Sequence, residues 1–182
     1  MNKRERIEKV ILYGVFICYI LLLLKILFLS RISLSGLFDS QRSAYRSINL
    51  IPFYSIIDYL SGGTEILTKL SFANVAGNII IFIPFGVYLP LFRKDKKIMA
   101  NLFLVIITSL FVEVIQWIFG IGTADIDDII LNCIGGLIGV LGYKILSHIL
   151  RVDKNMHTVI TILSIIGLPV ILYYLLLIKM QF

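Results

Sequence analysis

Charged residues and cysteines are both scarce in this chain of 182 residues. Charged residues make up 15% of the sequence and hydrophobic residues 59%, whereas an ordinary soluble domain has about 25% charged residues. This composition argues against a disordered chain and against a soluble globular enzyme. The two cysteines, Cys18 and Cys133, have no metal-type spacing, so a disulfide framework and a cysteine-based metal site are excluded.

The sequence is instead dominated by apolar runs, each about as long as a helix that crosses a bilayer. The five runs are residues 10–29, 74–92, 98–119, 126–150 and 159–178. We therefore expect an all-α, polytopic membrane helix bundle of about five transmembrane helices, forming a single domain over residues 1–182. The second run contains Pro84 and Pro90, so we expect its helix to be the weakest, either kinked at Pro84 or partly re-entrant.

Positive charges are grouped between the apolar runs, and the formal net charge is +6. The groups are Lys3, Arg4, Arg6 and Lys9; Arg93, Lys94, Lys96 and Lys97; and Lys144, Arg151 and Lys154. With five spans, all three groups fall on one side of the membrane, which the positive-inside rule makes cytoplasmic. The amino terminus is therefore predicted to be cytoplasmic. No basic patch is interleaved with aromatic residues in a soluble segment, which argues against a nucleic-acid partner.

The predicted external loop, residues 31–73, is more apolar than a plain linker. Its residues 50–60 are rich in aromatic and aliphatic side chains, and the following Ser-Gly-Gly-Thr sequence indicates a turn. A segment of this kind suits the membrane interface or a re-entrant cap; a packed loop without ligand contact is an equally good interpretation. Trp117, Tyr19, Tyr173 and Tyr174 are expected in the aromatic belts at the two membrane surfaces.

Polar side chains occur near the external ends of the second, third and fourth spans. They are Asn74 and Asn78; Ser109, Glu113 and Gln116; and Asp125, Asp127, Asp128 and Asn132. A charged side chain at the centre of a spanning helix costs about 2.5–3.5 kcal/mol on insertion scales, so it needs a partner, water or a function. On ideal helices all of these residues except Asp127 share inward faces. The sequence therefore predicts an outward-opening polar pocket, with Asp127 directed to the other side.

Structural roles compete with this interpretation. The aspartates could stabilise a helix N-terminus through the helix dipole, and Asn78 and Asn132 could join helices by hydrogen bonds. Gly135 and Gly139 form a small-xxx-small pattern, which predicts close helix packing directly below the pocket.

Four motifs in order resemble the VanZ-like family, which is named for a teicoplanin-resistance membrane protein. They are Asn49-Leu50-Ile51-Pro52-Phe53, residues 78–86, Glu113-Val114-Ile115-Gln116, and residues 125–132 with Gly135-Gly136. The resemblance covers a core of residues 49–142. It implies a multi-pass protein of the bacterial plasma membrane, with a link to glycopeptide tolerance through the cell envelope. The site residues that it carries over are Asn49, Asn78, Glu113, Gln116, Asp125, Asp128 and Asn132.

Three classes of function fit these observations. The first, which we favour, is a non-enzymatic envelope protein whose pocket binds a membrane lipid, the headgroup of a lipid-linked cell-wall precursor, or a lipoglycopeptide; it requires no cofactor. The second is an intramembrane enzyme acting on a lipid-linked phosphate or glycan, with Mg²⁺ or Mn²⁺ held by Glu113, Asp125 and Asp128. The third is a small transporter, for which no inverted repeat is visible. The oligomeric state is left open by the sequence.

Overall fold

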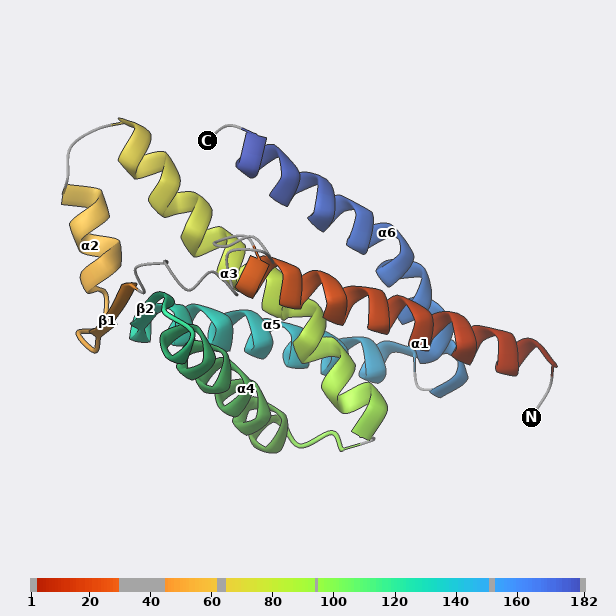
Figure 1. The fold of residues 1–182 in the computed structure, drawn as a ribbon. Helices are drawn as coiled ribbons and strands as arrows, with labels where there is room; N and C mark the ends of the chain where they lie inside the picture. Colours follow the sequence, from red (N-terminus) through yellow and green to blue (C-terminus); the bar gives the residue numbers. More distant parts are fainter. Residues whose placement is uncertain (1–2, 30–44, 62–64, 94, 151–152, 181–182) are drawn as a thin grey trace.

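The computed structural model describes residues 3–29, 45–61, 65–93, 95–150 and 153–180, and these residues are almost entirely helical (Figure 1). The elements in chain order are α1 (Lys3–Leu24), the π-helical segment η1 (Lys25–Leu29), β1 (Tyr45–Asn49), α2 (Tyr54–Ser61), α3 (Glu65–Arg93), α4 (Ile98–Ile118), β2 (Ile121–Asp125), α5 (Ile126–Leu150) and α6 (Asp153–Met180).

Five of the described helices are long and apolar enough to cross a membrane. The candidate spans are Arg6–Phe28, Phe72–Arg93, Ile98–Ile118, Ile126–Leu150 and Met156–Tyr173. Their outer faces carry many exposed large apolar side chains, as expected where lipid tails replace water around the bundle. The predicted multi-pass helix bundle is thereby confirmed.

Helix α3 is one continuous helix from Glu65 to Arg93, with Pro84 and Pro90 inside it. A single helix of 29 residues is about 43 Å long, so it can cross the membrane and cannot turn back within it. The re-entrant alternative for the second span is therefore wrong. The helix also begins nine residues earlier than the predicted run, inside what was expected to be loop.

A small parallel sheet was not predicted from the sequence. Strand β1 lies in the first loop and β2 lies between α4 and α5, and they pair with Asn49 opposite Asp125. Gly120, with a φ of 60°, makes the turn that ends α4 and leads into β2, a position where glycine avoids the steric penalty of a side chain. The sheet therefore fixes the first loop to the α4–α5 connection.

Helices α3 and α5 form the closest pair in the bundle. A Cβ added at Gly135 or Gly139 would collide with the backbone of Ile79 or Ile83 on α3, and one at Gly86 would collide with Gly136. The small-xxx-small pattern thus packs as predicted, with the backbones of the two helices in contact. Helices α4 and α6 lie on opposite sides of this pair (Figure 1).

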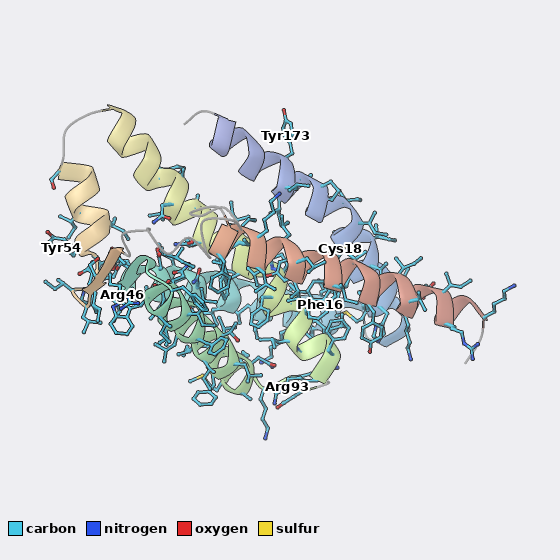
Figure 2. The ribbon with its side chains drawn as sticks, in the orientation of Figure 1. Phe16, Cys18, Arg46, Tyr54, Arg93 and Tyr173 are labelled. Carbon is cyan, nitrogen blue, oxygen red and sulfur yellow. The ribbon has the colours of Figure 1, made fainter. Side chains whose placement is uncertain are left out.

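Aromatic side chains fill the contact between α1 and α3. Phe16 packs edge-on against Tyr88 and Phe92, and Tyr13 stacks on Phe92. Tyr19 is buried and donates a hydrogen bond of 2.7 Å to the carbonyl oxygen of Ile81. Its predicted place in an aromatic belt is therefore wrong, because its hydroxyl is satisfied by the backbone of a neighbouring span. Tyr173, in contrast, points outward from α6 (Figure 2).

Candidate functional site

The candidate site is built where β2 passes into α5. Asp125 is the last residue of β2, and its carboxylate accepts a hydrogen bond of 3.0 Å from the backbone N–H of Asp127. This is the geometry of a helix N-cap, which satisfies one of the free N–H groups of the first turn. The side-chain amide of Asn49, opposite Asp125 in the sheet, donates to the same carboxylate at 3.3 Å.

Glu113 joins α4 to this strand end. It is buried at 3% exposure, and its Oε2 accepts a hydrogen bond of 3.0 Å from the backbone N–H of Asp125. A buried carboxylate needs such partners because its desolvation is otherwise costly. Glu113 and Asn49 therefore hold Asp125 through its backbone and its side chain respectively.

Asn78 and Asp128 connect α3 to the start of α5. The Asn78 amide donates a hydrogen bond of 2.6 Å to Oδ1 of Asp128. Asp128 also lies in the first turn of α5, where the helix dipole favours a negative charge. The predicted meeting of spans two and four is thus observed as a direct side-chain contact.

Asn132 and Ser109 connect α5 to α4 one turn deeper. The Asn132 amide donates to the Ser109 hydroxyl oxygen at 2.9 Å, and both residues are at most 1% exposed. The side-chain carbonyl oxygen of Asn132 is buried and has no hydrogen-bond partner among the described residues. It is an acceptor available to a donor that enters the cluster.

Gln116 contacts the first span rather than the start of α5. It is buried at 2% exposure, and its amide donates a hydrogen bond of 2.8 Å to the carbonyl oxygen of Leu27 in η1. Gln116 therefore binds α4 to the end of the first span, and no hydrogen bond between it and the carboxylates of α5 was found among the described residues.

The sequence did not reveal the partner of Asp127. We expected this residue to point to the other side of the helix from Asp125 and Asp128. It is buried at 2% exposure, and its Oδ1 accepts a hydrogen bond from the backbone N–H of Phe53 in the first loop. Phe53 has a φ of 64°, a left-handed conformation that costs a non-glycine residue about 1–2 kcal/mol. The run of three aspartates in four residues was the available signal, because a helix dipole alone does not require three carboxylates.

Two further contacts reinforce the sheet. The Ser47 hydroxyl lies 2.6 Å from the Thr123 hydroxyl, and the Arg46 guanidinium donates a hydrogen bond of 3.1 Å to the carbonyl oxygen of Ile118 at the end of α4. Arg46 and Tyr54 lie at the same end of the bundle, whereas Arg93 lies towards the end where α3 terminates (Figure 2). The hydrogen-bonded residues around the β2–α5 junction and the basic α3–α4 loop are therefore at different ends of the spans.

We define the polar cluster as Asn49, Asn78, Glu113, Asp125, Asp127, Asp128, Asn132 and Ser109. Its members are exposed to different degrees. Asn49, Asn78 and Asp125 are half-buried, whereas Glu113, Asp128 and Asn132 are buried behind them. The half-buried residues are therefore the more accessible members of the polar cluster.

The metal-ligand set considered for an enzyme is not assembled. Among the described residues, no three His, Cys, Asp or Glu side chains are grouped so that they could hold a metal ion. Glu113 and Asp128 instead take hydrogen bonds from Asp125 and Asn78. Their observed role is to join strand and helix ends.

These features define a multi-pass membrane helix bundle with a hydrogen-bonded polar cluster at one end of three spans. A family model described as VanZ/LLP1 matches residues 16–147, which include every candidate site residue. The chain is also 30% identical over 167 residues to Protein VanZ from Enterococcus faecium, covering 91% of this chain and 93% of that protein. The chain belongs to the VanZ/LLP1 family. No solved structure matches it.

Proposed function

We propose that this protein acts in the bacterial plasma membrane by binding the headgroup of a membrane lipid or lipid-linked cell-wall precursor, and that this binding lowers susceptibility to teicoplanin and related lipoglycopeptides. The observation that carries the proposal is the meeting of buried carboxylates and amides from α3, α4 and α5 around one strand end. Family membership and the similarity to Protein VanZ support the link to the cell envelope.

The charge of the polar cluster indicates what kind of headgroup fits. Glu113, Asp125, Asp127 and Asp128 are carboxylic acids, and ionised carboxylates only accept hydrogen bonds. A bare phosphate would be repelled by them, whereas hydroxyl, amide N–H and ammonium groups would be attracted. The unpartnered carbonyl oxygen of Asn132 adds one more acceptor. Sugar hydroxyls and peptide N–H groups of a cell-wall precursor have this donor chemistry.

The apolar segment beside the cluster supports a ligand that is anchored in lipid. Five of its side chains are between 52% and 71% exposed, namely Leu50, Ile51, Phe53, Tyr54 and Ile57. Apolar and aromatic side chains outside a span favour the interfacial layer where headgroups lie. Asp127 fixes this segment to the start of α5 through Phe53, so the segment and the polar cluster lie at the same end of the spans.

Substitution of the cluster tests the proposal in a host where deletion of the gene raises teicoplanin susceptibility. We expect Glu113→Ala and Asp128→Ala to give the susceptibility of the deletion strain, because each removes an acceptor from the cluster. Asn101→Ala is the matched control: Asn101 is also buried on α4, but its amide binds the backbone of Asp95 and Lys97 at the other end of the helix. Membrane levels of all three variants are measured in parallel by immunoblotting.

A binding measurement tests the proposed ligand independently of the susceptibility phenotype. Purified protein is photo-crosslinked to a lipid-linked precursor that carries its sugar and stem peptide, and separately to the same polyprenyl chain bearing phosphate alone. We expect crosslinking of the complete precursor by wild type, and a loss of it in Asp128→Ala. Two results would contradict the proposal. One is wild-type teicoplanin susceptibility in both single variants, Glu113→Ala and Asp128→Ala, when each is inserted at normal levels. The other is equal crosslinking of the lipid that bears phosphate alone.

A further inference from the structure

A second candidate binding region lies away from the polar cluster. A pocket of about 440 Å³ is lined by residues of α1, α3, α5 and α6, and no residue of the polar cluster lines it. Its lining on α6 extends from Ile160 to Ile171, a distance of about 16 Å at the rise of an α-helix. That is about half of the hydrocarbon thickness of a bilayer, so the cavity has the depth of one leaflet.

The lining of the cavity is suited to a hydrocarbon chain and poorly suited to water. The hydroxyls of Tyr19 and Tyr88 are already bonded, to the carbonyl oxygen of Ile81 and the hydroxyl of Ser164, both at 2.7 Å. A buried water needs two to four polar partners, and the remaining lining is almost entirely apolar. Ile149, which lines the cavity, is 68% exposed, so the cavity opens sideways towards lipid.

Two glycines create the free space. Gly142 on α5 and Gly167 on α6 both line the cavity, and a Cβ added at either would meet no atom within 4 Å. Three residues before Gly142, a Cβ at Gly139 would collide with the backbone of α3. The cavity is therefore a feature of the face of α5 that turns towards α6, where side chains would otherwise fill the gap.

Two basic side chains flank the α5 wall of the cavity. That wall reaches Ile149, one residue before the end of the helix, and Lys144 and His148 directly precede the lining residues Ile145 and Ile149. Lys144 and His148 are exposed on the last turns of α5. Basic groups between spanning helices at the cytoplasmic surface attract anionic lipid headgroups. We propose that the cavity holds an acyl chain of an anionic phospholipid whose headgroup lies at the α5–α6 junction.

Filling the cavity tests this proposal. The full-length protein is purified in mild detergent, and the retained phospholipid is measured by mass spectrometry. We expect wild type to retain phosphatidylglycerol, and Gly142→Phe and Gly167→Phe to retain about tenfold less, which corresponds to about 1.4 kcal/mol of binding free energy. Gly14→Phe is the matched control, because a Cβ at Gly14 also meets open space but Gly14 does not line the cavity.

A charge substitution tests the headgroup part separately. Lys144→Gln should lower phosphatidylglycerol retention about fivefold, while Lys97→Gln, an exposed lysine in the α3–α4 loop, should leave it unchanged. Retention by Gly142→Phe at the wild-type level would overturn the proposal. If the filled variants do not fold, native mass spectrometry of wild type still decides, because equal or tighter binding of phosphatidylcholine or polyprenyl phosphate would also overturn it. These readouts are independent of teicoplanin susceptibility and of precursor crosslinking.

Discussion

Helix α5 uses glycine in opposite ways on two of its sides. On the side facing α3, Gly135 and Gly139 remove side chains so that two backbones touch. On the side facing α6, Gly142 leaves space that no other side chain occupies. Glycine therefore contributes both to the closest helix contact in the bundle and to one wall of the cavity. Which of these occurs depends on how closely the neighbouring helix packs against α5.

The tight side and the polar cluster depend on each other. Asn78 directly precedes Ile79, whose backbone meets Gly135, and Asn132 lies three residues before that glycine. A hydrogen bond between side chains on two helices, such as that of Asn78 with Asp128, requires the helices to stay in register. The close α3–α5 contact supplies that register, whereas no hydrogen bond between α6 and the polar cluster is found among the described side chains.

The largest expected effect is the difference in unfolding free energy between variants that add a side chain at Gly139 and at Gly142. Gly139→Leu forces a side chain into the backbone of α3 and should lower the free energy of unfolding by about 3 kcal/mol or more. Gly142→Leu adds the same side chain into open space and should change that free energy by less than about 1 kcal/mol. Unfolding of both variants in detergent, followed by circular dichroism, measures the difference. Equal destabilisation would remove the contrast between the two sides.

A smaller effect is expected where the polar cluster holds the first loop. Asp127→Ala removes the acceptor for the Phe53 N–H, and a hydrogen bond to a charged group contributes about 1.5–3 kcal/mol. The loss of stability should be confined to the first loop. The Phe53 and Ile57 amides should therefore exchange hydrogen faster, while the exchange rate at Gly139 should stay the same. Asp95→Ala is the control, because its carboxylate binds the Lys97 N–H in the other loop. Faster exchange along the whole of α5 would show that the loop and the α3–α5 contact are one cooperative unit.

The bundle itself was predictable from sequence because the length of an apolar run is a local property. Five runs gave five spans, and the glycine pattern gave the α3–α5 contact. The continuity of α3 through Pro84 was not predictable, since a proline breaks or bends a helix unless neighbouring groups satisfy the freed backbone. That compensation depends on packing, which the sequence does not display.

The contacts among the candidate site residues could be predicted from the sequence only in part. Helical periodicity placed Asn78, Glu113, Asp128 and Asn132 on inward faces, and Asn78–Asp128 and Ser109–Asn132 do meet. The parallel pairing of Asn49 with Asp125 joins positions that are 76 residues apart, and no periodicity reports such a contact. The partner of Asp127 could not be predicted for the same reason, because the Phe53 N–H belongs to that distant loop.

The smallest expected effect compares single hydrogen bonds on the two sides of α5. The Ser109–Asn132 bond lies in the tightly packed part of the bundle, and the Tyr88–Ser164 bond lines the cavity. A double-mutant cycle with Ser109→Ala and Asn132→Ala should give a coupling free energy of about 0.6 kcal/mol, the average for such bonds in membrane proteins.

The matching cycle with Tyr88→Phe and Ser164→Ala should give a smaller value. Helix α6 borders open space at Gly167, so it can relax when the bond is lost and each hydroxyl can find another partner. Buried Asn132 has no such freedom, because its side-chain oxygen already has no partner among the residues that the structure describes. A larger coupling free energy for Tyr88–Ser164 than for Ser109–Asn132 would mean that α6 is packed as firmly as α4. The cavity would then be a rigid feature of the bundle and not a consequence of loose packing.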